Sequence, residues 1–136
     1  MELVFTETSV AIEREGDVVK ARQTGRELAA ALGFSSTDQT LIATAISEVA
    51  RNIVTYAGHG AIAFSRIERQ GRAGILIVAS DQGPGIPDLE LALRDGYSTG
   101  HSLGVGLPGA RRLVDEFELE SAVGVGTTVT LRKWRL

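Results

Sequence analysis

Residues 75–87 change abruptly in character, and this change constrains the fold more than any other feature of the sequence. Ile75 to Ala79 are continuously apolar, which is typical of a strand buried on both faces. The next stretch, Asp81 to Pro87, reads DQGPGIP, and its two glycines and two prolines cannot continue a strand. The sequence therefore predicts an inner strand that ends in a tight, exposed loop, with the carboxylate of Asp81 at its rim.

Alternation of apolar and polar residues predicts the other strands. Residues 2–12 alternate except near Glu7 to Ser9, which indicates an edge strand with an irregularity. The remaining strand-like segments predict two hairpins, formed by residues 61–69 with 75–79 and by residues 118–123 with 127–134.

Helical spacing of apolar residues predicts three main helices. The first spans Asp17–Leu32 and stops at Gly33. A capping box of Ser36 and Gln39 opens the second, which ends at Ala57 before Gly58. The third spans Gly106–Phe117 with Pro108 in its first turn, and a shorter helix is expected at Asp88–Arg94.

The second helix carries an apolar stripe that should face the sheet. Its members are Ile42, Ala45, Ile46, Val49, Ile53, Tyr56 and Ala57. Strands in hairpins together with helices of this kind indicate a two-layer α/β (α+β) sandwich. We therefore expect one domain, residues 1–136, with a mixed but mostly antiparallel sheet covered by helices on one face and partly solvated on the other.

Charge and composition exclude several classes of protein. A net charge of -3 does not suit a general binder of nucleic acid, and the absence of cysteine excludes disulfides, thiolate zinc sites and a cysteine nucleophile. The N-terminus lacks the pattern of a signal peptide, and no apolar run approaches the ~20 residues of a membrane span. We expect a cytoplasmic protein with neither nucleic acid nor a membrane as partner.

Glu48 and Asn52 are the first candidate functional pair. They lie four residues apart at the border of the apolar stripe, so they stack on one side of the second helix. A carboxylate can accept a proton, and a carboxamide oxygen can ligate a hard cation such as Mg²⁺. The alternative is a solvated polar pair on an amphipathic helix.

Asp81, Gly83 and Gly85 form the second candidate. Glycines permit close approach of a flat ligand, and the carboxylate could accept a proton from an exocyclic amine such as that of adenine. The alternative is an ordinary turn in which the aspartate bonds its own backbone.

Two further segments fit an anion or nucleotide site. Residues 104–109, GVGLPG, open the third helix, whose unpaired amides could bind phosphate. No strand directly precedes this segment, which disfavours a dinucleotide fold, and the sequence contains no P-loop. Thr127 begins the last strand, where its hydroxyl could reach a ligand or Asp81, although threonine is also common in strands for packing reasons.

The order and spacing of these elements resemble the GHKL (Bergerat-fold) ATP-binding superfamily. Glu48-x-x-x-Asn52 resembles its N box, Asp81-x-Gly83-x-Gly85 its first glycine box, Gly104-x-Gly106-Leu107 its second, and Gly126-Thr127 its closing threonine. The resemblance implies that ATP and Mg²⁺ are bound. Asn52 would hold Mg²⁺, Asp81 and Thr127 would recognise adenine, and Gly83 and Gly85 would shape its pocket. The amides of Gly104, Val105, Gly106 and Leu107 would hold phosphates, and residues 86–103 would form a lid.

Within the superfamily, the short chain resembles the compact serine/threonine kinases of stress and sigma-factor pathways. In such a kinase Glu48 would be the general base for transfer to a serine or threonine. The implied partners are STAS-domain scaffold proteins of a stressosome and the regulatory part of a PP2C-type phosphatase, which the released kinase activates. The alternatives are an anti-sigma-factor kinase that sequesters a sigma subunit, and a binding module gated by ATP without catalysis.

Overall fold

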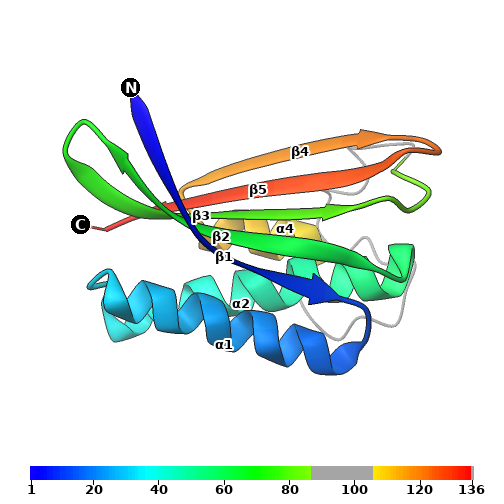
Figure 1. Cartoon of the computed structure of the whole chain (residues 1–136), viewed down its shortest axis with the longest axis horizontal. Coiled ribbons are helices and arrows are strands. Elements are labelled where there is room, and N and C mark those ends of the chain that lie inside the picture. Colours follow the sequence, from blue (N-terminus) through cyan, green and yellow to red (C-terminus); the bar gives the residue numbers. More distant parts are fainter. Residues whose placement is uncertain (87–105, 136) are drawn as a thin grey trace.

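The computed structural model describes residues 1–86 and 106–135 (Figure 1). The described elements, in chain order, are β1 (Glu2–Ile12), α1 (Glu15–Ala31), α2 (Ser36–Asn52), a π-helical turn η1 (Ile53–Ala57), β2 (Gly60–Arg69), β3 (Arg72–Asp81), α4 (Gly106–Leu113), β4 (Glu116–Ala122) and β5 (Gly126–Trp134). The helix expected at Asp88–Arg94 and most of the expected lid lie outside the described residues.

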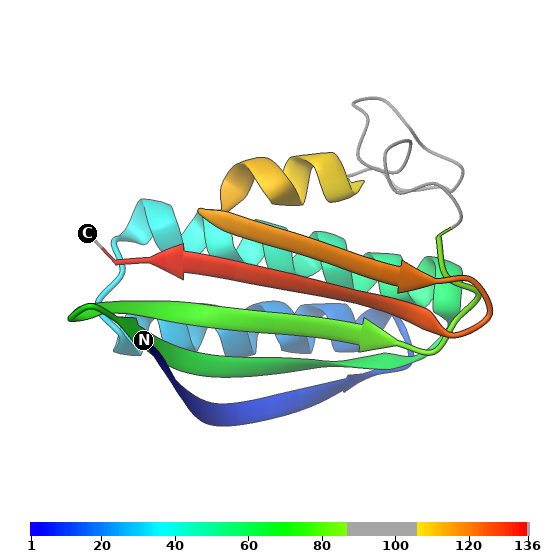
Figure 2. The same cartoon turned by 90° about the horizontal axis from the view of Figure 1, so that it is seen from above.

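The described strands form one sheet in the order β1-β2-β3-β5-β4 (Figure 2). Each of the four pairings is antiparallel, and β3 lies at the centre as its continuous apolar run predicts. β1 is an edge strand whose register shifts between Thr6 and Thr8, within the expected irregularity. The two hairpins are confirmed, although the turn before β3 is shorter than expected because β3 begins at Arg72.

The helices lie on one face of the sheet (Figure 1). They bury one hydrophobic core, to which α2 contributes Ile42, Ala45, Ile46 and Val49 and the sheet contributes Phe64 and Ile77. This arrangement confirms the two-layer α+β sandwich. None of the described helices combines the length and the apolar character that crossing a bilayer requires.

The prediction that Tyr56 belongs to the apolar stripe facing the sheet is wrong, because its side chain is 43% exposed. The reason is the π-helical turn η1, in which Gly58 N–H bonds to Ile53 O at 2.8 Å. A π turn holds more residues than an α turn, so side chains after Ile53, which is itself buried, rotate away from the extrapolated stripe. Gly58 ends the helical segment as expected, with a φ of 86°.

Other expected helix boundaries are also wrong, and the first helix spans Glu15–Ala31 rather than Asp17–Leu32. Ser35, not Ser36, caps α2 by accepting a hydrogen bond from Asp38 N–H at 3.1 Å, and the Gln39 side chain donates to Phe34 O instead of completing a capping box. α4 ends at Leu113 rather than Phe117, because Phe117 pairs with Leu131 in the β4–β5 ladder.

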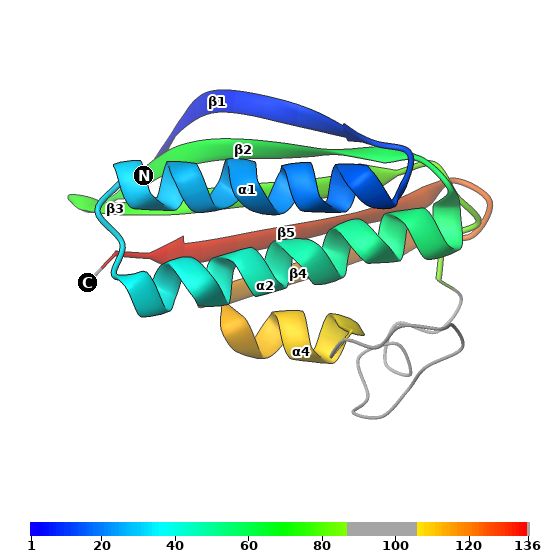
Figure 3. The ribbon, with the colours of Figure 1, turned by 90° about the horizontal axis from the view of Figure 1, so that it is seen from below.

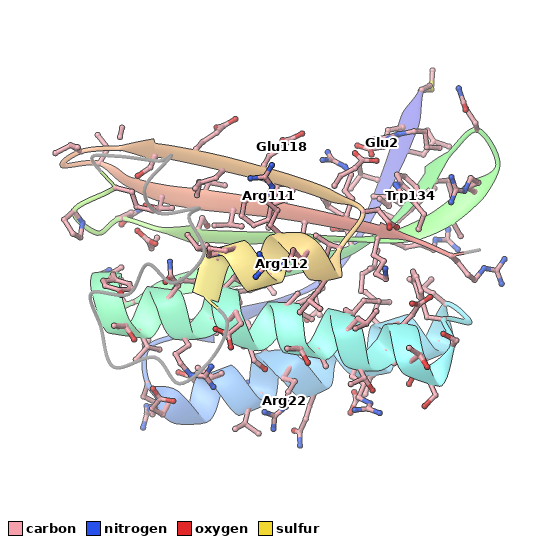
Figure 4. The ribbon with its side chains drawn as sticks, turned by 180° about the vertical axis from the view of Figure 1, so that it is seen from behind. Glu2, Arg22, Arg111, Arg112, Glu118 and Trp134 are labelled. Atoms are coloured by element: carbon pink, nitrogen blue, oxygen red, sulfur yellow. The ribbon has the colours of Figure 1, made fainter. Side chains whose placement is uncertain are left out.

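The other face of the sheet carries a small satellite cluster and a network of charges (Figure 4). Trp134 is buried beneath Arg69, whose guanidinium lies 4.7 Å from the centre of an indole ring. Arg69 also bonds Glu116 at 2.7 Å and Glu2 at 3.0 Å. Hydrogen bonding by Arg132 lowers the pKa of Glu2, and hydrogen bonding by Arg69 and Trp134 lowers the pKa of Glu116.

Acid should remove the contribution of this network to stability. A carboxyl whose pKa is lowered by folding stabilises the protein above its ordinary pKa of about 4.5 and ceases to do so as the pH falls through the lowered value. We expect Glu116→Gln to reduce the free energy of unfolding by about 0.5–1 kcal/mol at pH 7 and by much less at pH 3, measured by thermal denaturation. Glu120→Gln, an exposed change in the same strand, serves as the control. An equal loss at both pH values would contradict the assignment.

Candidate nucleotide site

The candidate residues lie on elements that adjoin at one end of the molecule (Figure 3). At that end lie the C-terminal end of α2 with η1, the end of β3 and the β4–β5 turn. Ile53 and Asp81 both approach Gly60: a Cβ at Gly60 would stand 2.9 Å from Ile53 Cγ2 and 3.1 Å from Asp81 Cβ. The helix that carries Asn52 therefore packs against the strand end that carries Asp81.

Asp81 is the last residue of β3 and is fixed through one carboxylate oxygen. Its Oδ1 accepts hydrogen bonds from Gly83 N–H at 2.9 Å and from Thr127 N–H at 3.2 Å. The first is the ordinary turn contact that the sequence left open, and the second is a contact from a different strand. Within the described part of the chain, Oδ2 has no hydrogen-bond partner. The carboxylate is thus held in one orientation with an acceptor left for a ligand.

The glycines after Asp81 serve close packing of the loop. A Cβ at Gly83 would stand 2.7 Å from Ala57 Cβ, and Gly85 has a φ of 80° and touches Ala122. Pro84 O also accepts a hydrogen bond from Gly124 N–H at 2.8 Å. These contacts explain why the loop requires glycine, and a role for Gly83 and Gly85 in shaping an adenine pocket stays a prediction.

Glu48 is buried, with 6% of its surface exposed, and both of its oxygens are engaged. Oε1 lies 3.1 Å from Arg51 Nη1, and Oε2 accepts a hydrogen bond from Gly106 N–H at 3.0 Å. The alternative of a solvated polar pair is therefore wrong for Glu48. Instead, its carboxylate is the anion at the N-terminus of α4, where the helix dipole favours negative charge.

Asn52, one turn beyond Glu48, is the last residue of α2 and is partly buried. Its side chain makes no hydrogen bond within residues 1–86 and 106–135, so its carboxamide oxygen is free to accept a ligand there. No group of three or more His, Asp or Glu side chains gathers as a metal site among those residues. Any cation at Asn52 would need most of its ligands from outside the described residues.

The second glycine segment is described only from Gly106 onward. Gly106 has a φ of 67° and begins α4, while the Leu107 side chain is buried in the core. Gly104 and Val105 lie outside the described residues. Of the four amides expected to hold phosphates, those of Gly106 and Leu107 are described, and the Gly106 N–H donates to Glu48 Oε2.

Thr127 is buried and joins Asp81 through its backbone rather than its hydroxyl. The Thr127 Oγ1 atom lies 2.9 Å from Ser121 Oγ, in the strand opposite. Sequence reasoning missed both Ser121 and Arg51. The signals were present: Ser121 is the hairpin partner of Thr127, and Arg51 follows Glu48 by three residues on one helix.

Comparison with known proteins supports the nucleotide assignment. Residues 37–136 match the family model described as histidine kinase-, DNA gyrase B- and HSP90-like ATPase. The chain is 51% identical over 128 residues to the serine/threonine-protein kinase RsbT of Bacillus subtilis, which covers 94% of this chain and 96% of that protein. It is 32% identical over 120 residues to the anti-sigma F factor of Geobacillus stearothermophilus, with 83% and 81% of the two chains covered.

A solved structure supports the fold. The crystal structure of the RsbU and RsbW domains of Rv1364c from Mycobacterium tuberculosis matches 96% of this chain with a TM-score of 0.60 and 21% identity. The match spans 34% of that longer chain. The family model and the two curated relatives agree with the order of motifs in the sequence and with the sandwich seen in the structure. The chain therefore belongs to the histidine kinase-, DNA gyrase B- and HSP90-like ATPase family.

Proposed function

We propose that this chain is an ATP-dependent serine/threonine-protein kinase of a sigma-factor regulatory pathway. It phosphorylates STAS-domain scaffold proteins of a stressosome and, once released, binds and activates a PP2C-type phosphatase. The observation that carries the proposal is the 51% identity to a serine/threonine-protein kinase along 94% of the chain. The family match supports ATP as the phosphoryl donor.

Asp81 is the residue that recognises the adenine of ATP. Its Oδ1 is occupied by two backbone amides, so Oδ2 remains to accept a hydrogen bond from the exocyclic amine. A carboxylate cannot donate, and it therefore disfavours a purine that presents a carbonyl oxygen at the same position. Asp81 thus selects adenine over guanine.

Asn52 fits a magnesium ion that travels with the triphosphate. Mg²⁺ binds few protein groups and takes its remaining ligands from water and phosphate oxygens, and the carboxamide of Asn52 is one such oxygen ligand. When bound, the ion neutralises negative charge on the phosphates. Asn52 would hold it at the end of α2, one turn from Glu48.

Glu48 acts as the general base. As the substrate hydroxyl forms a bond to the γ-phosphorus and the bond to the bridging oxygen of the leaving ADP breaks, the carboxylate accepts the hydroxyl proton. The amides at the start of α4 hold the phosphates in line. Because Glu48 Oε2 accepts the Gly106 N–H in this structure, that amide has to leave the carboxylate before it can donate to a phosphate.

A second candidate is an anti-sigma factor that sequesters a sigma subunit. The 32% identity to an anti-sigma F factor over 83% of the chain supports it. The two functions share the nucleotide site and differ in the partner. A non-catalytic module gated by ATP is the third possibility, and it predicts nucleotide binding without transfer.

One experiment separates these functions. The protein is incubated with Mg²⁺ and ATP labelled at the γ-phosphate, together with a STAS-domain protein encoded in the same genome. We expect label on a serine or threonine of the STAS protein, and co-purification of STAS protein and phosphatase. Binding of ATP with no label on the STAS protein, together with capture of a sigma subunit, would contradict the proposal in favour of the anti-sigma factor.

A further inference from the structure

Ser121 lies where three segments meet beside the candidate adenine site: β4, the glycine loop and the start of β5. It lies in the edge strand β4, directly opposite Thr127 in β5. Its Oγ accepts a hydrogen bond from Ile86 N–H at 2.7 Å, at the end of the glycine loop. The same atom lies 3.1 Å from Gly126 O and 2.9 Å from Thr127 Oγ1. One hydroxyl thus ties the loop that follows Asp81 to the start of β5.

Because the Ser121 hydroxyl has a single proton, only two arrangements of hydrogen bonds among Ser121, Thr127 and Gly126 are possible. A hydroxyl has one proton and two lone pairs, and one lone pair is taken by Ile86 N–H. If Ser121 donates to Gly126 O, Thr127 donates to Ser121 and offers only lone pairs elsewhere. If Ser121 donates to Thr127, the Thr127 proton is free to point at a ligand. Both arrangements place a hydrogen bond at the 2.9 Å contact with Thr127, and only the first also uses Gly126 O at 3.1 Å, so an acceptor on a ligand opposite Thr127 is what selects the second.

The two arrangements differ in what Thr127 offers to a purine. Adenine presents an acceptor at N1 beside the donor amine that Asp81 recognises, so a donor is needed for N1. Thr127 is attached to Asp81 Oδ1 through its own N–H, which places its hydroxyl next to the recognised edge of the base. Only the arrangement in which Ser121 donates to Thr127 supplies that donor.

We propose that Ser121 is a positioning residue for adenine recognition: it orients the Thr127 hydroxyl as a donor toward purine N1 and holds the Ile86 end of the glycine loop. The proposal rests on the proposed function as an ATP-dependent enzyme. Thr127 is already implied in adenine recognition by the family resemblance, and the new element is Ser121, which sets the direction of the Thr127 hydroxyl. Ser121 acts through Thr127 and need not touch the nucleotide.

The test compares ATP with 1-deaza-ATP, in which a C–H group replaces N1. Binding is measured by isothermal titration calorimetry on the full chain. We expect the wild type to bind ATP about tenfold more tightly than 1-deaza-ATP, the worth of one hydrogen bond in a shielded site. In Ser121→Ala this preference should disappear, because loss of the bond to Ile86 affects both ligands alike, whereas loss of the N1 donor lowers the affinity for ATP alone. General damage to the site would instead weaken both ligands equally, and that result would overturn the proposal.

Three further variants keep the result interpretable. Ser121→Thr retains the hydroxyl and should restore the preference for ATP over 1-deaza-ATP. Thr127→Val removes the hydroxyl that Ser121 orients, so Ser121→Ala should lower ATP affinity by less than twofold in that background. Ser9→Ala, an exposed serine in the other edge strand, should bind both ligands as the wild type does. A preference for ATP that survives in Ser121→Ala would overturn the proposal.

The proposal and the proposed function fail differently. If the wild type binds neither ATP nor 1-deaza-ATP, the nucleotide site itself is wrong. If the wild type binds ATP and phosphorylates its partner while Ser121→Ala keeps the full preference for N1, the function stands and the role of Ser121 is wrong.

Discussion

Replacing Glu48 by glutamine should abolish phosphoryl transfer while ATP binding is retained. Glutamine has nearly the same shape and its carbonyl oxygen can still accept the Gly106 N–H, so the start of α4 stays capped. It cannot take up the proton of a substrate hydroxyl at neutral pH. We expect the rate of transfer to fall by about 10²- to 10⁴-fold, the usual contribution of a general base.

ATP affinity in this variant should be equal to or greater than that of the wild type. The carboxylate of Glu48 occupies the positive end of α4, where it repels phosphate and competes for the Gly106 amide. A neutral side chain removes the repulsion. Glu48→Ala should likewise bind ATP and fail in transfer, but it leaves the Gly106 amide without its acceptor and should be less stable.

Transfer and binding are measured separately, by labelling of the partner protein with γ-labelled ATP and by calorimetry. Glu27→Gln, an exposed change on α1, is the matched control for loss of one negative charge and should transfer at the wild-type rate. Transfer by Glu48→Gln at more than a tenth of the wild-type rate would remove Glu48 as the base. Loss of ATP binding in the same variant would show instead that its carboxylate serves the nucleotide site structurally.

The layers and the central strand could be predicted because their signals are local. The apolar run of β3 and the glycine loop after it depend on residues that are adjacent in sequence, and both are confirmed. Helix boundaries depend on less local information. Ser35 and Ser36 both fit the pattern of an N-cap, and only the backbone conformation selects Ser35.

Long-range pairing explains the remaining errors in the fold. Phe117 continues the helical spacing of α4, but its partner Leu131 in β5 draws it into the sheet. A pairing of this kind overrides local propensity because it buries an apolar side chain against a second strand. Residues 113–117, LVDEF, contain neither glycine nor proline, so no local signal marks the end of the helix.

The same distinction between local signals and long-range contacts applies to the candidate site. Glu48, Asn52 and Asp81 could be proposed as candidates from spacing and from the elements that carry them, and their roles stay predictions. The bond between Glu48 and Gly106 could not, because the two residues are 58 positions apart and meet only when α4 packs against α2. The same is true of the bond between Asp81 and Thr127, which are 46 positions apart.

The geometry of Asp81 makes its amide variant unusually informative. Two backbone donors, Gly83 N–H and Thr127 N–H, converge on Oδ1. In Asp81→Asn this position requires the carbonyl oxygen, because an NH₂ group there would face two donors. The NH₂ group is therefore forced into the place of Oδ2, the atom proposed to accept the adenine amine. The variant exchanges an acceptor for a donor at one atom and leaves the loop anchored.

Asp81→Asn should consequently lose ATP and gain tolerance for purines with a carbonyl oxygen at position 6. Against the adenine amine the variant sets donor against donor, and we expect ATP affinity to fall by about 100-fold, the loss of a charge-assisted hydrogen bond with a buried group left unpaired. Inosine triphosphate should then bind at least as tightly as ATP, because Thr127 can donate to Ser121 and accept the N1–H of inosine. Purine riboside triphosphate lacks the amine and makes no hydrogen bond to Oδ2, so its affinities for the variant and the wild type should lie within about threefold of each other.

Calorimetry with the three nucleotides measures all of these affinities. Equal weakening toward all three would mean that Asp81 maintains the loop and does not read the base, whereas unchanged ATP affinity would place the adenine elsewhere.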